Sequence, residues 1–349
     1  MRLGRLRTVA VRTGYPMAMP RSAMRIEAEA LCKKYPEATN LALARRISKE
    51  FHVSIEAARS TVRVIRGNKG NVQRKHATVK KPNGKAGQLP TMPPSLAEPW
   101  TPFVAEGVKR VGIISDVHIP YHSDVAFATA VAHLKTLAID TLLINGDFCD
   151  FYQVSRWQKD PRKRRFSEER KLIIEALDWL RGEFGKKCRI IFKDGNHEER
   201  FTHFIWNRSP EIYDLPSCQI PTLLEFERVG VEYITDQRPV ILGKLPVLHG
   251  HELGRSGISS PVNPSRGVFL RTMHTVLVGH GHRTSTHVEK DMFDKEVAVW
   301  STGCLCSKNP DYQRVSKSNW GFSSVEIDRD GSFNVHNFRI SNSGEVRTS

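Results

Sequence analysis

Five short segments of this chain carry side chains that bind divalent metal ions, and each follows a short apolar run. Asp, Asn and His supply the oxygen and nitrogen ligands that suit manganese, iron or zinc when thiolate is absent. Two such ions can activate a water for attack on a phosphoester. The five sets, occurring in order, indicate an enzyme. The segments are Asp116-Val117-His118, Gly146–Asp150, Gly195–Glu198, Leu248–His251 and Gly279–His282.

The apolar runs before these segments predict buried β-strands, because they are short, apolar and bounded by Gly or Asp. Ligand sites in α/β folds lie at the carboxyl ends of such strands, so we expect the five segments to meet at one sheet edge. Asp116 and His118 are two apart in a segment expected to be extended, which would point both side chains the same way. The runs are Val111–Ser115, Thr141–Asn145, Arg189–Lys193, Pro239–Val247 and Thr275–Val278.

The spacing downstream predicts one long helix and then a meander of strands. The helix is expected over Ser167–Phe184, with Leu172, Ala176, Trp179 and Leu180 along its buried face. Short alternating runs predict strands over 287–289, 296–301, 322–327 and 334–339.

In their order and spacing the five segments match the signature D-x-H, G-D-x-x-D, G-N-H-[DE], a later H, and G-H-x-H. The chain therefore resembles the calcineurin-like metallophosphoesterase superfamily over Asp116 to His282. The resemblance implies a four-layer α-β-β-α sandwich over residues 100–349 and two divalent ions, manganese being expected and iron or zinc the alternatives. It implies seven ligands, with Asp147 bridging: Asp116, His118, Asp147 and His282 for the first ion, and Asn196, His249 and His280 for the second.

The same resemblance implies a phosphoester hydrolase that uses a bridging hydroxide as its nucleophile. His197 follows ligand Asn196, and in the resembled family this histidine protonates or stabilises the departing oxygen. Asp150, the second Asp of the G-D-x-x-D segment, would orient His197 by hydrogen bonding. Glu198 is interpreted as a supporting residue. His251, His122, His274 and His287 have no matching position in the signature and are interpreted as structural or surface residues.

Positive charge is concentrated before the metal-binding segments. Residues 1–100 contain 20 Lys and Arg against 6 Asp and Glu, whereas residues 101–349 contain 33 against 31. This asymmetry indicates a polyanionic partner, although a solubilising tail is the alternative. Residues 1–23 have five Arg and no acid, and they are interpreted as a disordered arm.

Residues 24–67 predict three helices, which form a small all-α domain resembling a helix-turn-helix module. Thr39 or Asn40 can cap the second helix and Ser54 the third. In the third helix Arg59, Arg63 and Arg66 share one face and are candidate DNA contacts. The alternative is an accessory domain that contacts protein. Residues 68–99, rich in Pro and Lys, are interpreted as a basic linker.

A second basic stretch follows Asp150 and could hold a phosphate backbone beside the metal site. Trp157 and Phe166 lie within it and could stack on bases. The alternative is a solvated loop. The candidate contacts are Arg156, Arg162, Arg164 and Arg165, together with Arg200 close after His197.

Taken together, these features favour a nucleic-acid phosphodiesterase or nuclease, with DNA favoured as substrate. One alternative is a protein or small-molecule phosphatase or phosphodiesterase whose N-terminal domain contacts protein. Another is a DNA-binding regulator with little activity. No apolar run approaches the roughly 20 residues that cross a bilayer, and the six scattered cysteines are typical of reduced thiols. We therefore expect a cytoplasmic protein without a membrane partner; the oligomeric state stays open.

Overall fold

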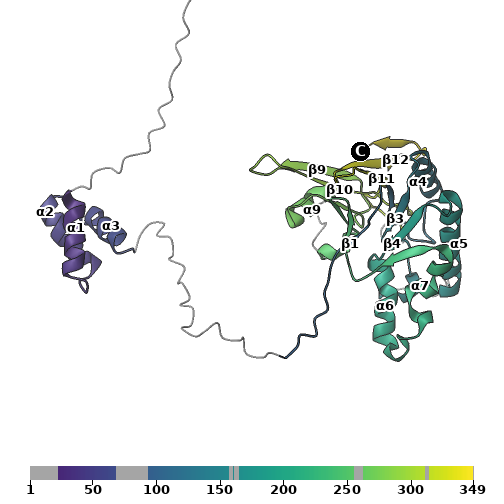
Figure 1. Ribbon diagram of the computed structural model, residues 1–349, viewed down its shortest axis with the longest axis horizontal. Helices are drawn as coiled ribbons and strands as arrows, with labels where there is room; N and C mark the ends of the chain where they lie inside the picture. Colours follow the sequence, from purple (N-terminus) through teal and green to yellow (C-terminus); the bar gives the residue numbers. More distant parts are fainter. Residues whose placement is uncertain are drawn as a thin grey trace, which may run out of the picture. The chain divides into compact units, whose positions relative to one another are not determined.

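The computed structural model describes residues 23–67, 93–156, 160, 165–254, 262–310 and 314–348. The chain divides into two compact units, Met1–Leu96 and Ala97–Ser349, seen in Figure 1. The predicted disordered arm, apart from Ala23, and residues 68–92 of the predicted linker lie outside the described residues. Residues 93–99 form no helix or strand.

The first unit contains three helices at the predicted positions. They are α1 (Ala23–Lys34), α2 (Asn40–Phe51) and α3 (Ile55–Ile65). Thr39 Oγ1 accepts a hydrogen bond from the amide of Ala42, and Ser54 Oγ accepts one from the amide of Ala57, so both predicted caps are present. Ala58 and Val62 of α3 pack against Leu31 and Ile47 in a small core.

The second unit contains two mixed β-sheets. The seven-stranded sheet has the order β13-β12-β11-β2-β3-β4-β5, and the six-stranded sheet has the order β1-β6-β7-β8-β10-β9. The strands of the first are β2 (Arg110–Ile114), β3 (Thr141–Asn145), β4 (Arg189–Lys193), β5 (Val231–Ile234), β11 (Trp320–Ile327), β12 (Phe333–Ile340) and β13 (Val346–Thr348). Those of the second are β1 (Phe103–Val104), β6 (Val240–Leu242), β7 (Leu245–Leu248), β8 (Val276–Val278), β9 (Ser285–Lys290) and β10 (Glu296–Ser301).

Six α-helices and four short 3₁₀-helices join these strands within the described residues. The α-helices are α4 (Asp124–Thr136), α5 (Phe166–Phe184), α6 (Asn196–Arg208), α7 (Ile220–Leu223), α8 (Phe226–Val229) and α9 (Pro264–Thr272). The 3₁₀-helices are η1 (Tyr152–Val154), η2 (Pro210–Ile212), η3 (Pro216–Cys218) and η4 (His251–Leu253). None of the described helices has the length and apolar character needed to cross a bilayer.

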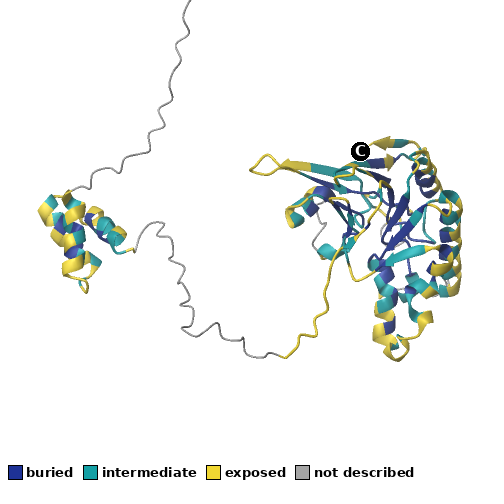
Figure 2. Cartoon of the chain, viewed as in Figure 1, coloured by how far each residue is buried: buried dark blue, intermediate teal, exposed yellow. Residues whose placement is uncertain are grey.

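The two sheets pack face to face and each is covered by helices on its outer face, which gives the expected α-β-β-α sandwich. Successive side chains of a strand point to opposite faces. Leu143 of β3 and Ile191 of β4 therefore join the core between the sheets, whereas Ile144 and Phe192 pack against α4 and α5. On the other side, Val268 of α9 packs on β8 and β10. Burial on both faces explains why the runs are uniformly apolar, and Figure 2 shows the central strands as buried.

Three sequence-based expectations about these elements are wrong. Pro239–Val247 is not one strand: β6 and β7 form a hairpin that turns at Gly243, where φ is 59°. The metal-binding segments do not meet at one sheet edge, because β7 and β8 belong to the six-stranded sheet. The predicted face of α5 fails only at Leu172, which is 43% exposed; Ala176, Trp179 and Leu180 pack on the core as predicted, together with Ile173 and Leu177.

A buried ion pair links the two sheets near the predicted site. Lys193 Nζ at the end of β4 lies 2.7 Å from Glu252 Oε1 in η4, and the two side chains are 1% and 8% exposed. Glu252 also accepts hydrogen bonds from the amides of His249 and Gly250. Burial alone would raise the pKa of Glu252, but the charge of Lys193 lowers it to about 2. The Glu252 carboxyl is therefore ionised at neutral pH.

We expect Lys193→Met to lower the free energy of unfolding by about 3–5 kcal/mol, because it leaves the buried Glu252 carboxylate unpaired. The double variant Lys193→Met/Glu252→Gln should lose less than the sum of the single variants. Urea unfolding followed by circular dichroism measures both effects. Lys244→Met, which breaks the exposed Lys244–Asp330 pair, is the control and should change little. Additive losses in the double variant would contradict the coupling.

Candidate metal centre and active site

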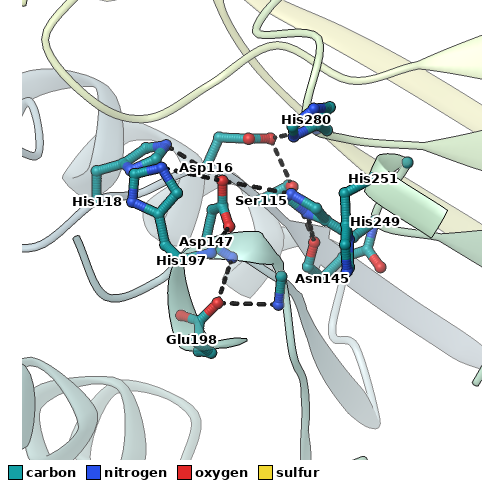
Figure 3. A network of polar contacts seen from close by, with 12 residues as sticks. Ser115, Asp116, His118, Asn145, Asp147, His197, Glu198, His249, His251 and His280 are labelled. Atoms are coloured by element: carbon teal, nitrogen blue, oxygen red, sulfur yellow. Dashed lines mark hydrogen bonds and ion pairs between the residues drawn. The ribbon is translucent and has the colours of Figure 1, made fainter. Parts of the chain in front are cut away.

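All seven predicted metal ligands, together with His197 and Asp150, lie close together in the second unit. The ligands follow the carboxyl ends of five strands that come from both sheets. Figure 3 shows Asp147 between His118 and His197 on one side and His249 on the other. β2 leads to Asp116 and His118, β3 to Asp147, β4 to Asn196 at the start of α6, β7 to His249, and β8 to His280 and His282.

Five of the seven predicted ligands have a left-handed backbone. φ is 56° at Asp116, 52° at His118, 52° at Asp147, 59° at His280 and 52° at His282. The expectation of an extended Asp116–His118 segment is therefore wrong. β2 ends at Ile114, and the backbone after it is left-handed at Asp116 and His118. For residues with a Cβ atom this conformation costs about 1–2 kcal/mol each. Five of the thirteen non-glycine residues with positive φ in the described part of the chain thus belong to the predicted site.

Asp147 lies at the centre of the site. Its Oδ2 is 3.7 Å from Nε2 of His118, 3.7 Å from Nε2 of His197 and 3.4 Å from Nε2 of His249. Its Oδ1 accepts a hydrogen bond from the amide of His197. Burial would raise the pKa of Asp147, but the charges of His197 and His249 hold it well below its usual value. One ionised carboxylate therefore faces ring nitrogens from several directions.

On one side of Asp147, four side chains converge. Potential ligand atoms of Asp116, His118 and Asp147 lie within 4.8 Å of one another. His282 Nε2 is 3.2 Å from Asp116 Oδ1 and 3.2 Å from His118 Nε2. His118 Nδ1 faces the carboxylate of Asp150 at 3.2 Å, which places a proton on Nδ1 and leaves the Nε2 lone pair toward the group in the neutral ring. This arrangement fits a cation.

A second group lies on the other side of Asp147 and shares its carboxylate. Potential ligand atoms of Asp147, His249 and His280 lie within 4.8 Å of one another. His249 Nδ1 donates to the carbonyl of Asn145 at 2.8 Å, so its Nε2 faces Asp147 and offers a lone pair once the ring is neutral. Asn196 Oδ1 and His249 Nε2 are buried without a hydrogen-bond partner among the described residues. Buried polar atoms are rarely left unpaired, so this donor set also fits a cation.

The carboxylates and neighbouring histidines of the site shift the pKa values of His249 and His280. Burial would lower the pKa of His249, but Asp147 and Asp116 raise it to about 10. Burial and the charge of His249 lower the pKa of His280 to about 4. In the metal-free protein the proton of His249 thus compensates part of the carboxylate charge. A divalent ion in the second group would have to displace it, because only a free imidazole nitrogen binds metal.

His197 is held by residues on both sides of its ring. Nδ1 lies 2.9 Å from the carbonyl oxygen of Asp150 and 3.3 Å from its carboxylate, while Arg200 Nη2 is 2.6 Å from Nε2. Since arginine only donates, Nε2 is an acceptor and the proton lies on Nδ1. The predicted contact between Asp150 and His197 is present, although its shorter bond uses the backbone. Arg200, predicted as a phosphate contact, touches the predicted catalytic histidine.

Glu198 supports the loops that carry the ligands. Its carboxylate accepts hydrogen bonds from the amides of Asp147, Cys149 and Gly195, which agrees with the predicted supporting role. Gly195 lies against Asp147: a Cβ atom there would collide with the Asp147 carboxylate and amide. The glycine therefore lets the start of α6 approach the central carboxylate.

Cys306, interpreted from the sequence as one of the scattered reduced thiols, is a contact of the site. Its Sγ lies 3.8 Å from Nδ1 of His282, whose other nitrogen faces Asp116. Metal-binding histidines usually donate the second N–H to an oxygen, and here the acceptor is sulfur. Residue spacing could not predict this contact, because it depends on how the chain folds back toward His282 after β10. His251, interpreted as structural, bonds Glu199 at 3.0 Å.

A cleft of about 550 Å³ opens onto the site. Its lining combines residues of the metal centre with a separate segment that follows β10. The lining residues are His118, Asp147, Asn196, His197, His280, Gly281, His282, Arg283, Val315, Ser316, Lys317 and Ser318.

The predicted basic contacts after Asp150 are only partly described. Arg162, Arg164 and Trp157 lie outside the described residues, whereas Arg156 and Arg165 are exposed. The expectation that Phe166 stacks on bases is wrong, since its ring packs against Phe151 and Phe201, with ring centroids 5.8 and 5.7 Å away.

In the first unit the three predicted DNA contacts have different surroundings. Arg59 and Arg63 lie 3.8 and 3.7 Å from the exposed Glu56 carboxylate. Arg66 instead donates to the carbonyls of Tyr35, Pro36 and Ala38 and to Asn40 Oδ1. Its guanidinium thus stabilises the turn between α1 and α2, so only Arg59 and Arg63 stay candidate DNA contacts.

We expect Cys306→Ala to weaken metal binding at the His282 group by roughly 10–100-fold, the usual effect of losing a group that orients a metal-binding histidine. Cys306→Ser, which keeps a hydrogen-bond acceptor, should lose less. Competition with a chelator, followed by elemental analysis, measures the affinity. Cys188→Ala removes a buried thiol at the opposite end of β4 and serves as control. Equal metal affinity in Cys306→Ala and the wild type would rule out this role.

Most of the second unit is similar in sequence to a known family. The family description "Calcineurin-like phosphoesterase" matches residues 109–311, more than half of the chain. Gene 54 protein of Mycobacterium phage D29 is 23% identical over 233 residues, which cover 63% of this chain and 89% of the phage protein. Vps29 of Chaetomium thermophilum aligns with 13% identity and a TM-score of 0.35, covering 69% of this chain and 96% of that chain. This chain belongs to the calcineurin-like phosphoesterase family and is a metal-dependent phosphoester hydrolase.

Proposed function

We propose that the protein is a nucleic-acid phosphodiesterase with a dinuclear metal centre, that DNA is its favoured substrate, and that the N-terminal unit recruits it. The observation that carries the catalytic part is the sharing of Asp147 by two groups of potential ligands. Asp116, His118, Asp147 and His282 would hold one ion; Asp147, Asn196, His249 and His280 would hold the other. Manganese is the proposed metal, since the donor set combines oxygen and nitrogen. When bound, the two ions would supply an activated water as the nucleophile and would neutralise phosphate charge.

His197 is the proposed general acid for the leaving oxygen. Its Nε2 lies on the metal-facing side, 3.7 Å from Asp147 Oδ2, and Asp150 fixes the ring through Nδ1. To donate, Nε2 must carry a proton and must be released by Arg200. A phosphate entering the site offers Arg200 a charged acceptor, and charge-assisted bonds are stronger than a bond to a neutral imidazole. When Arg200 binds the phosphate, it would therefore also release Nε2 of His197 from its hydrogen bond.

The charge distribution supports nucleic acid as the substrate. Residues 1–100 carry a net charge of +14, from 20 basic and 6 acidic residues, whereas the remainder is nearly neutral. Nucleic-acid phosphates are the abundant polyanion that such a segment would bind. The half-buried Arg59 and Arg63 on α3 are candidate contacts.

The point at which the chain enters the second unit also supports recruitment. Trp100 Nε1 donates to the carbonyl of Asp236, and β1 then pairs with β6. The neighbouring Gln237 bonds Glu199, near the start of α6 where Asn196 and His197 lie. The linker therefore joins the second unit close to the end of the sheet that carries the site. A polymer held by the first unit would have a raised effective concentration there.

Replacing His197 by Ala should lower kcat by roughly 10²–10⁴-fold for diesters with poor leaving groups. The loss should shrink as the pKa of the leaving phenol falls, because a good leaving group needs less protonation. Metal content should stay near two ions per chain, whereas Asp147→Ala should lose metal and activity together. His274→Gln, at an exposed position, is the control. Losses of the same size across all leaving groups would eliminate the general-acid assignment.

Deleting residues 1–96 should weaken DNA binding and flatten its dependence on salt, yet leave hydrolysis of bis-p-nitrophenyl phosphate nearly unchanged. Log affinity falls with log salt at a slope of about −0.9 per neutralised phosphate, so the change in slope gives the number of phosphates that residues 1–96 neutralise. Arg59→Ala/Arg63→Ala in the full chain should reproduce part of the effect without disturbing the turn that Arg66 holds. If the truncated enzyme binds DNA as tightly and as salt-sensitively as the full chain, recruitment is wrong and the protein-contact alternative leads.

A further inference from the structure

Part of the cleft lining has no role in holding metal or in the proposed acid catalysis. It consists of Arg283, directly after the ligand His282, and of Val315–Ser318 in the connection between β10 and β11. Asp147 is the only acid among the described residues that line this cleft, and it faces the metal groups. The side chains of Arg283 and Lys317 therefore add positive charge to the cleft beyond the metal positions.

The Val315–Ser318 segment is fixed next to the metal ligand by Asn319. The amide of Asn319 donates to the carbonyl of His282 at 2.9 Å, and its Oδ1 accepts from the amide of Thr284 at 2.9 Å. Its Nδ2 donates to Thr284 Oγ1 at 2.7 Å. A Cβ atom at Gly303 would collide with Asn319 and Thr284, so the packing around this clamp is tight. Lys317 lies two residues before Asn319, so the hydrogen bonds of Asn319 hold it at the cleft.

The local backbone is also ordered around the two cations. Ser316 Oγ donates to the carbonyl of Lys308 and accepts from the amide of Ser318, which closes a short turn around Lys317. Arg283 lines the cleft, and its Nη2 donates to the carbonyl of Val262 at 2.8 Å. Lys317 is exposed and can reach a ligand in the cleft.

We propose that Arg283 and Lys317 form a second phosphate subsite, which binds a phosphate next to the one being cleaved. A cleft of about 550 Å³ is of the size that holds a drug-sized ligand, and a single phosphate does not fill it. The scissile phosphate would be neutralised at the metal positions, whereas a neighbouring phosphate needs cations from the chain. The subsite rests on the proposed phosphodiesterase function and narrows its substrate to esters that carry at least two phosphates.

The test compares a monophosphate with a bisphosphate in the full-length enzyme. Hydrolysis of bis-p-nitrophenyl phosphate, which has one phosphate, is the reporter. Thymidine 5′-monophosphate and thymidine 3′,5′-bisphosphate are the competing inhibitors. The variants are Arg283→Ala, Lys317→Ala and the double variant, and Lys109→Ala is an exposed control before β2, at the end of the sheet remote from the site.

In the wild type the bisphosphate should inhibit at least roughly tenfold more strongly than the monophosphate, as expected for added charge-assisted bonds. The double variant should lose most of this preference, while kcat and KM for the reporter stay within about twofold, since the reporter leaves the subsite empty. Lys109→Ala should behave like the wild type.

The subsite is wrong if the wild type shows no preference for the bisphosphate, or if the double variant keeps it. It is equally wrong if the double variant loses reporter kcat by about tenfold, since both cations would then act on the scissile phosphate. Failure of the nuclease proposal looks different. An enzyme that cleaves no oligonucleotide, yet loses its bisphosphate preference in the double variant, has the subsite but another bisphosphorylated substrate.

Discussion

The rest of this structure depends on the crowding of electron-pair donors around Asp147. The potential ligand atoms of each group there lie within 4.8 Å of one another, and buried acceptor atoms at the site have no hydrogen-bond partner among the described residues. Protonated histidines offset part of the negative charge of the carboxylates in these groups, as the raised pKa of His249 illustrates. The face-to-face sandwich brings the strand ends of its two sheets to one place, and this geometry makes the crowding possible.

Several buried groups maintain that geometry without touching the ions. Glu198 gathers three loop amides, and the Lys193–Glu252 pair connects the ends of two sheets that share no hydrogen-bonded strand pair among the described residues. Asn319 performs a similar task for the cleft, because it joins the chain after β10 to the loop of His282. Polar contacts of this kind fix orientation, whereas the apolar cores between and outside the sheets supply most of the cohesion.

Much of this could be predicted from the sequence. β3 and β4 begin and end where predicted, because strands buried on both faces give apolar runs with sharp limits. β10, predicted from an alternating run, also has the predicted bounds. The seven predicted ligands come from a motif whose residues follow the strand ends, and the structure brings these residues together. The failures concern contacts between distant segments. Nothing next to Cys306 or Lys317 in the sequence relates these residues to the site. The helical spacing of Arg66 is the same whether its side chain faces solvent or a turn, so spacing alone predicts a DNA contact.

The left-handed backbone of five proposed ligands has a consequence for how this protein can change. At these positions a residue without a Cβ atom would relieve strain, and exchanging a buried charged or imidazole side chain for a small one would also remove repulsion between neighbours. Selection for thermal stability alone should therefore favour substitutions that destroy catalysis, as happens where function maintains a strained site. Family members that have lost catalysis are then expected to carry substitutions first at these five positions, while the surrounding sandwich stays intact. The positions are Asp116, His118, Asp147, His280 and His282.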